Sequence, residues 1–106
     1  MAPTRELCLQ IYIETKRYTR KYSIQYDSPV NLFFRTISLI GGSDKHDQWR
    51  ELKRGVEIVI GTPGRIIELV RKKAFSLQTR CSYLVVDEAD VMFNMGFEYQ
   101  IRSIIG

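Results

Sequence analysis

Short apolar blocks separated by turn residues predict an alternation of helices and strands. We predict helices over about residues 5–21, from Ser43 or Asp44 to Gly55, after Thr62-Pro63, from Ala89 to Gly96, and over 97–105. Strands are predicted over 32–40 (best in 36–40), 56–60 and 83–86. This order indicates an α/β fold with parallel strands joined by right-handed crossovers. The first helix has no strand before it, so we expect a partial parallel sheet flanked by helices, truncated at both ends.

One stretch joins an apolar run directly to acidic residues, Tyr83-Leu84-Val85-Val86 followed by Asp87-Glu88-Ala89-Asp90. Such a short apolar run predicts a buried parallel strand, and ligands of open α/β sheets bind beyond the carboxyl ends of the strands. Carboxylates held close together need a cation or a shared proton, and Mg²⁺ carrying a phosphate ester is the common solution. The alternative is a solvated acidic first turn of a helix.

Each predicted strand ends in glycines or polar residues. These clusters are Gly41-Gly42, Gly61-Thr62-Pro63-Gly64-Arg65 and Asp87-Glu88-Ala89-Asp90, and Pro3-Thr4-Arg5 precedes the first helix in the same way. Because the carboxyl ends of parallel strands share one edge, we expect the clusters to gather on one face with the composition of a phosphate-binding surface. Taken singly, each has a structural explanation, since Thr-Pro is a common helix start and Gly-Gly a common loop.

Composition adds modest constraints. The chain has 106 residues, of which 44% are hydrophobic, as expected for one small domain. The net charge of +4 suits a phosphate-backbone partner, although basic clusters near predicted helix ends are equally explained by the helix dipole. No segment approaches the roughly 20 apolar residues that span a bilayer, and no signal peptide follows Met1. Cys8 and Cys81 lack metal-ligand spacing, so we expect reduced core residues of an intracellular protein.

Four motifs in order resemble those of the DEAD-box RNA helicases, in the first of their RecA-like domains. Pro3-Thr4-Arg5-Glu6-Leu7 resembles motif Ia, Gly41-Gly42 the GG motif, Thr62-Pro63-Gly64-Arg65 motif Ib, and Asp87-Glu88-Ala89-Asp90 motif II; the run 92–97 also matches the family. The resemblance covers nearly the whole chain. It implies a RecA-like (P-loop NTPase) fold, with residues 1–106 as part of the helicase ATP-binding domain.

The resemblance also implies ATP and Mg²⁺ as cofactors. Asp87 would hold Mg²⁺ through a water, and Glu88 would orient and deprotonate the water that attacks the γ-phosphate. Asp90 would hydrogen-bond toward motif III and link hydrolysis to domain closure. The residues by themselves place Asp87 on the metal and leave Glu88 and Asp90 open as the base. The implied activity of the intact protein is RNA-stimulated ATP hydrolysis and local unwinding of RNA.

The remaining motifs would grip one RNA strand by its sugar–phosphate backbone. The predicted RNA-binding residues are Pro3, Thr4, Arg5, Gly41, Gly42, Thr62, Pro63, Gly64 and Arg65. The threonines offer hydroxyls beside helix N-termini, the arginines offer charge-assisted contacts, and the glycines let the backbone approach. Such contacts carry no base information, so binding should tolerate sequence and be sensitive to salt.

The chain departs from the family pattern mainly by what its sequence lacks. It contains no Gly-x-x-x-x-Gly-Lys-Ser/Thr phosphate-binding loop, Q motif, motif III or second RecA-like domain, so we expect the chain alone to be inactive. Residues 23–34 are expected to form an extended loop or insertion. The alternatives are a truncated or degenerate non-catalytic copy that at most binds RNA or a protein, and an unrelated Mg²⁺-dependent domain. Similarity to the nuclear, splicing-associated branch implies a nuclear location and spliceosomal or other RNP partners. The lack of a long apolar segment predicts no membrane association.

Overall fold

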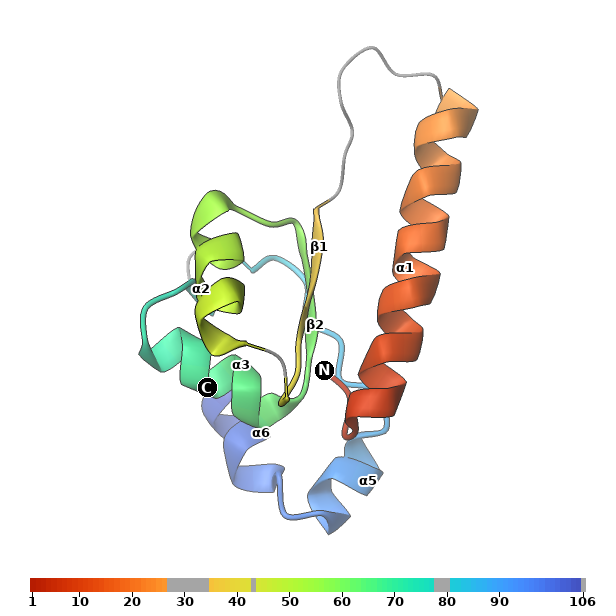
Figure 1. The fold of residues 1–106 in the computed structure, drawn as a ribbon. Helices are drawn as coiled ribbons and strands as arrows, with labels where there is room; N and C mark the ends of the chain where they lie inside the picture. Colours follow the sequence, from red (N-terminus) through yellow and green to blue (C-terminus); the bar gives the residue numbers. More distant parts are fainter. Residues whose placement is uncertain (27–34, 43, 78–80, 106) are drawn as a thin grey trace.

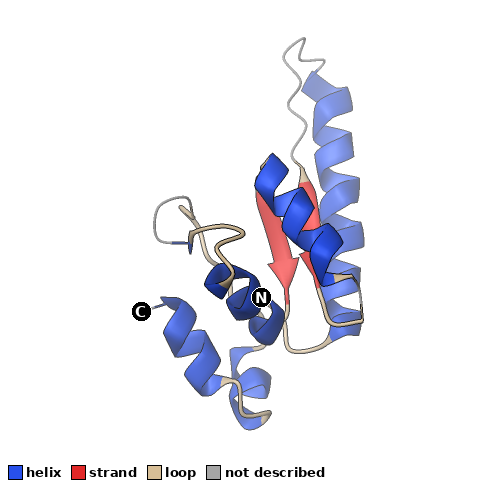
Figure 2. Cartoon of the chain, turned by 60° about the vertical axis from the view of Figure 1, so that its left-hand side comes forward, coloured by secondary structure: helices blue, strands red, loops and turns tan. Residues whose placement is uncertain are grey.

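The computed structural model describes residues 1–26, 35–42, 44–77 and 81–105, and the chain forms helices on both sides of a short parallel sheet. The elements are α1 (Arg5–Tyr26), β1 (Thr36–Leu39), α2 (Lys45–Arg54), β2 (Ile58–Gly61), α3 (Pro63–Arg71), α5 (Ala89–Asn94) and α6 (Glu98–Ile105). Helix α1 covers one face of the strands and α2 the other (Figures 1 and 2), while α6 lies near α3. The predicted α/β class with parallel strands is confirmed.

Strands β1 and β2 pair in parallel from Thr36↔Ile58 to Leu39↔Gly61. Apolar clusters lie on the two faces of this pair. The cluster that includes residues of α2 and α3 contains Leu39, Leu52, Ile66, Leu69 and Ala74, and the cluster that includes the start of α1 contains Ala2, Cys8, Ile40 and Ile60. Leu39 of β1 and Val59 of β2 belong to or pack against the first cluster, whereas Ile60 of β2 and Ile40, the residue after β1, belong to the second. The sheet is therefore covered on both faces, as a parallel sheet requires.

Side-chain and glycine caps set the helix boundaries that the sequence predicts. Thr4 Oγ1 accepts a hydrogen bond from the Leu7 amide at 3.2 Å, and the Asp44 carboxylate accepts one from the His46 amide at 2.8 Å. These bonds satisfy amides that helix geometry leaves without intrahelical partners. Gly55 ends α2 with a φ of 97°, a conformation that favours glycine. The starts of α1 and α2 are therefore encoded locally, whereas α3 begins at Pro63 after Thr62 without a side-chain capping bond.

Helix α1 is longer than predicted. It continues to Tyr26 rather than ending near residue 21, because no glycine or proline occurs before Asp27-Ser28-Pro29. Residues 23–26 of the predicted loop at 23–34 are therefore helical, and 27–34 lie outside the described residues. The 22-residue helix is roughly 33 Å long, whereas a four-residue strand is about 13 Å. Its outer half extends past the sheet (Figure 1), and Tyr18 is 67% exposed.

No helix in the described ranges combines the length and the apolar character that crossing a membrane requires.

The predicted buried strand at residues 83–86 is wrong. Tyr83 is 84% exposed and Val85 58% exposed, and the segment forms no regular strand. Its backbone pairs with Met1, whose amino group donates to the Val85 carbonyl at 2.8 Å and whose carbonyl accepts from the Asp87 amide at 2.9 Å. This is the bonding pattern of parallel strands, but one partner residue cannot extend a ladder or bury its side chains.

The two cysteines differ in burial. Cys8 lies in the core, as predicted, and burial raises the pKa of its thiol. Cys81, also predicted to be a core residue, is exposed, because it precedes the uncovered segment 83–86. The prediction for Cys81 is therefore wrong, and for the same physical reason as the strand prediction.

Gly61 lies too close to the neighbouring strand to accept a side chain, and this generates a test of the fold. A Cβ at Gly61 would lie 2.5 Å from the Leu39 carbonyl oxygen, in backbone that the strand pairing holds in place. We expect Gly61→Ala to lower the free energy of unfolding by about 1–3 kcal/mol, the usual cost of overpacking. Urea denaturation measures this change. Gly41→Ala, whose Cβ would meet nothing within 4 Å, is the matched control. Equal unfolding midpoints for the two variants would contradict the packing.

Candidate nucleotide and nucleic-acid site

Backbone hydrogen bonds bring the four predicted motifs to the same edge of the sheet. The Thr62 amide donates to the Leu39 carbonyl at 3.1 Å, and the Ala2 amide donates to the Gly61 carbonyl at 3.2 Å. The bond from the Asp87 amide to Met1 then places motif II beside the segment that leads into motif Ia. Figure 1 shows the starts of α1, α3 and α5 at this end of the strands. The predicted gathering at one edge is therefore present in the fold.

Arg5 of motif Ia lies against the Gly41-Gly42 loop. Gly42 has a φ of 84°, and a Cβ there would lie 2.5 Å from Arg5 Nη1. Glycine at this position thus permits both the backbone conformation and the approach of the guanidinium. Arg5 remains exposed, so its charge is available to a ligand at the same loop. A Cβ at Gly64 would meet nothing within 4 Å, so the start of α3 is also open to close approach.

Arg65 of motif Ib is placed differently from Arg5, because its side chain is only 12% exposed. Its Nη1 donates to Gln48 Oε1 at 3.0 Å, and its Nε lies 3.5 Å from Glu68 Oε2. Gln48 is buried, and its Nε2 donates to the Ile40 carbonyl at 3.2 Å. The guanidinium is therefore held by side chains of both α2 and α3.

Sequence reasoning did not identify Gln48, Glu68 or Lys45 as parts of this site. Glu68 follows Arg65 by three residues on a predicted helix, a spacing at which opposite charges meet. That signal could have found the Arg65–Glu68 ion pair. Lys45 also pairs with Glu68, across the two helices. No local pattern indicates the contact of Gln48 with Arg65, because it depends on how α2 packs beside α3.

Motif II sits where the exposed segment turns into α5. Glu88 is the N-cap residue of α5 and adopts left-handed backbone angles, φ 52° and ψ 49°. Its carbonyl accepts from the Met92 amide at 3.0 Å, which fixes this conformation at the head of the helix. A non-glycine residue in the left-handed region is strained, and such residues cluster at functional sites. Asp87, Glu88 and Asp90 are all exposed.

The acidic residues at this edge fit a magnesium ion that is bound mainly by water and phosphate. Among the described residues, no group of three or more His, Cys, Asp or Glu side chains is placed to hold a metal ion by itself. Mg²⁺ in phosphate chemistry commonly uses one or two carboxylates and keeps several waters. Asp87, an exposed carboxylate next to the other motifs, meets that requirement.

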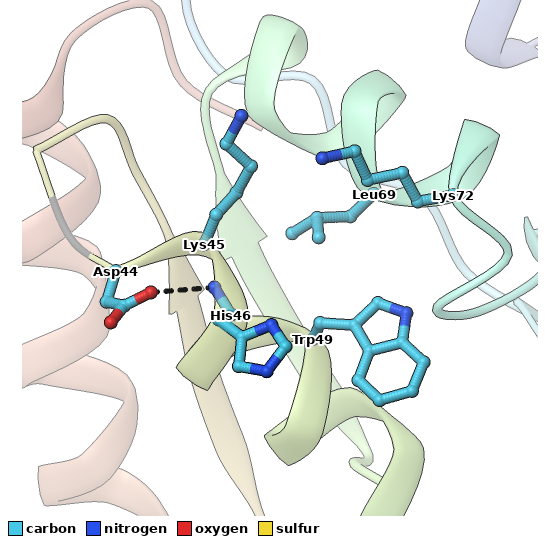
Figure 3. A pocket seen from close by; sticks show the side chains of 6 residues that line it. All are labelled: Asp44, Lys45, His46, Trp49, Leu69 and Lys72. Atoms are coloured by element: carbon cyan, nitrogen blue, oxygen red, sulfur yellow. Dashed lines mark hydrogen bonds between the residues drawn. The ribbon is translucent and has the colours of Figure 1, made fainter.

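A pocket of about 390 Å³ opens between α2 and α3 (Figure 3). Its lining residues are Asp44, Lys45, His46, Trp49, Leu69 and Lys72. The Lys53 ammonium lies 5.4 Å from the centre of the Trp49 ring, and His46 stacks on the same ring with the centroids 6.3 Å apart. None of the predicted catalytic or RNA-binding residues lines the pocket, so it is distinct from the motif edge.

Comparison with known proteins identifies the family of this chain. The DEAD/DEAH box helicase family profile matches residues 1–106. The chain is 48% identical to DEAD-box ATP-dependent RNA helicase 24 of Arabidopsis thaliana over 99% of its length, and 50% identical to human ATP-dependent RNA helicase DDX42 over 98%. Because the family profile covers the whole chain, the protein belongs to the DEAD/DEAH box helicase family.

Solved structures agree with this assignment. The crystal structure of the yeast DEAD-box splicing factor Prp28 superposes with a TM-score of 0.83 at 35% identity, covering 96% of the chain and 21% of that protein. A hypothetical ATP-dependent RNA helicase from Sulfolobus tokodaii matches with a TM-score of 0.79 at 30% identity, covering 96% of the chain and 27% of that protein. The chain spans 12% of the Arabidopsis relative and 10% of the human one. It thus corresponds to a section of a DEAD-box RecA-like domain.

The ion pairs around Arg65 generate a pH prediction. The hydrogen bond from Lys45 is the main cause that lowers the pKa of the Glu68 carboxyl below its ordinary value of 4.5. Partial burial opposes this shift, and the nearby charges of Lys45, Arg65 and Lys72 add to it. A lowered folded-state pKa contributes stability that is fully present above pH 4.5 and is lost as the pH falls through the lowered value.

We therefore expect Glu68→Gln to be less stable than the wild type at neutral pH, with the difference shrinking as the solution is acidified. The effect should be small because the Glu68 side chain is 35% exposed. Urea unfolding midpoints of both proteins, measured from neutral to acidic pH, test this. A difference that stays constant over that range would show that the carboxylate charge does not contribute.

Proposed function

We propose that the chain is part of the first RecA-like domain of an ATP-dependent RNA helicase, which couples ATP hydrolysis to RNA binding and local unwinding. The observation that carries this proposal is the shared edge, where backbone bonds through Met1, Ala2 and Thr62 set motifs Ia, GG, Ib and II side by side. The names of the relatives, ATP-dependent RNA helicases, support the same activity. The second RecA-like domain and the phosphate-binding loop would be supplied by the intact protein.

Motif II would carry the hydrolytic step. When bound, Mg²⁺ neutralises charge on the phosphates of ATP, and Asp87 would hold it through a water. Glu88 would orient the attacking water and accept its proton as the bond to the γ-phosphorus forms and the bond to the leaving ADP oxygen breaks. The strained, left-handed backbone of Glu88 supports this role, because such residues cluster at functional sites. Glu88 occupies the N-cap position of α5, so the helix fixes the point from which its side chain extends. Asp90, in the first turn of α5, would link hydrolysis to domain closure.

The other motifs would hold one RNA strand by its phosphates and sugars. Arg5 is exposed beside Gly42, so a phosphate at that loop would meet both a cation and accessible backbone. Pro3 and Thr4 precede α1, and Thr62, Pro63 and Gly64 begin α3, so two helix N-termini face the same edge. These contacts read no base edges, which supports binding that is independent of RNA sequence.

Similarity to the yeast splicing factor Prp28 leads us to include a nuclear location and spliceosomal or other RNP partners in the proposal. The proposed enzymatic function also makes a prediction about the adjoining sequence: the intact protein should encode a phosphate-binding loop of the form Gly-x-x-x-x-Gly-Lys-Ser/Thr upstream of Met1.

RNA binding tests the role of Arg5. Arg5→Ala should weaken binding of a fluorescent single-stranded RNA by about fivefold to tenfold, because it removes an exposed cation next to the glycine loop. The slope of log affinity against log salt should also decrease by about 0.7, the value for one phosphate contact on a single strand. Fluorescence anisotropy over a salt series measures both. Arg17→Ala, which removes an equally charged residue from the exposed side of α1, should bind as the wild type does. Identical affinities for the two variants would contradict the proposed RNA contact.

The role of Glu88 is tested in the intact protein. Glu88→Gln should lower RNA-stimulated ATP turnover by at least about 100-fold, since the amide keeps the size of the side chain but cannot accept the proton of the attacking water. Nucleotide affinity, measured with a fluorescent ATP analogue, should stay within a few-fold of the wild type. Glu14→Gln, the same change on the exposed side of α1, should leave turnover unaltered. Full turnover in Glu88→Gln would show that another group acts as the base.

A further inference from the structure

We propose that Gln48 is a positioning residue that ties the Gly41-Gly42 loop to Arg65 and so sets the spacing of two loops on the RNA-binding edge. This inference rests on the proposed RNA-binding function. Among the described residues, Gln48 is the buried polar side chain, with 6% exposure. Burying an amide is unfavourable unless its polar atoms are hydrogen-bonded, so the Nε2 and Oε1 atoms of Gln48 both require partners.

Both ends of the Gln48 amide are used, and each contacts a different loop. Nε2 donates to the carbonyl of Ile40, the residue that immediately precedes Gly41, at 3.2 Å. Oε1 accepts from Nη1 of Arg65, the last residue of motif Ib, at 3.0 Å. A single side chain therefore connects the backbone at the end of β1 with a guanidinium at the start of α3.

Glutamine is suited to this link by its pattern of donors and acceptors. A peptide carbonyl can only accept a hydrogen bond and a guanidinium can only donate, so the connecting group needs one donor and one acceptor. Glutamate has the acceptor for Arg65 but no donor for Ile40. Methionine has nearly the same shape and supplies neither strong donor nor strong acceptor. These differences make the two substitutions separable tests of the two bonds.

Neighbouring contacts make the link stiff. The Gln48 backbone amide donates at 3.2 Å to the carbonyl of Asp44, whose side chain caps α2, so the side chain projects from a fixed first turn. On the other side of Arg65, Glu68 is 3.5 Å from Nε and is itself paired with Lys45 of α2. Two bridges thus cross from α2 to α3, and one of them includes Gln48. Loss of the Gln48 amide would remove one of these two bridges.

A double-mutant cycle on RNA affinity tests the proposal. The dissociation constant of a fluorescent single-stranded RNA is measured for the wild type, Gln48→Met, Arg65→Ala and the double variant. We expect each single variant to bind about fivefold to tenfold more weakly and the double variant to match Arg65→Ala within about twofold, because Gln48 acts through Arg65. Gln10→Met, the same change at an exposed position of α1, should bind as the wild type does. Gln48→Glu should retain more affinity than Gln48→Met, since it keeps an acceptor for Arg65.

Other outcomes would overturn the proposal. Multiplicative losses in the double variant, or wild-type affinity in folded Gln48→Met, would show that Gln48 does not act through Arg65. Thermal unfolding identifies a variant that fails to fold, and in that case Gln48→Glu is compared with Arg65→Ala in the same cycle. Hydrogen exchange of the Arg65 guanidinium Nη–H groups, followed by NMR without RNA, should be faster in Gln48→Met than in the wild type, because Gln48 accepts from Nη1. Gln48→Glu, which keeps that acceptor, should show a smaller change; unchanged exchange in Gln48→Met contradicts the link. Absence of RNA binding by the wild type would instead reject the proposed function itself, and the inference with it.

Discussion

Parallel pairing of β1 and β2 is the constraint on which the other features of the molecule depend. In the observed register Leu39 lies opposite Gly61, and the Thr62 amide continues the ladder to the Leu39 carbonyl. Both strands therefore end at one edge, and the Ala2 amide adds the start of α1 to that edge by bonding to Gly61. The absence of a side chain at Gly61 permits the close approach of Leu39. Without this register the motifs would be separate loops.

Charge at the edge is organised in two ways. Arg5 is exposed beside Gly42 and is suited to meet a phosphate directly, whereas Arg65 is mostly covered and is held by Gln48 and Glu68. The carboxylates of motif II lie at the start of α5, next to the same edge. The cations that we propose to meet RNA phosphates and the carboxylates that we propose to meet a metal–nucleotide complex thus belong to adjoining segments. Such an arrangement suits a protein in which RNA binding affects hydrolysis.

Features that depend on local chemistry were predictable. Thr4, Asp44 and Gly55 act as helix caps because their own side chains or backbone angles satisfy nearby groups. Parallel pairing also followed from the alternation of elements. The burial of residues 83–86 was not predictable, because an apolar strand is buried only where neighbouring strands and helices cover it. Here that segment pairs with Met1 through two backbone bonds, and Tyr83 stays exposed.

The sequence by itself determined the class of fold, the family motifs and the residue types at the motif edge, since periodicity, caps and short motifs are properties of neighbouring residues. Tertiary structure decided how the motif residues are held. The Arg65 side chain is mostly covered and bonds to Gln48, which lies 17 positions earlier in the chain. Arg5 likewise lies next to Gly42, a residue far from it in the sequence. Their positions depend on how helices pack across the sheet, and no local pattern encodes that packing.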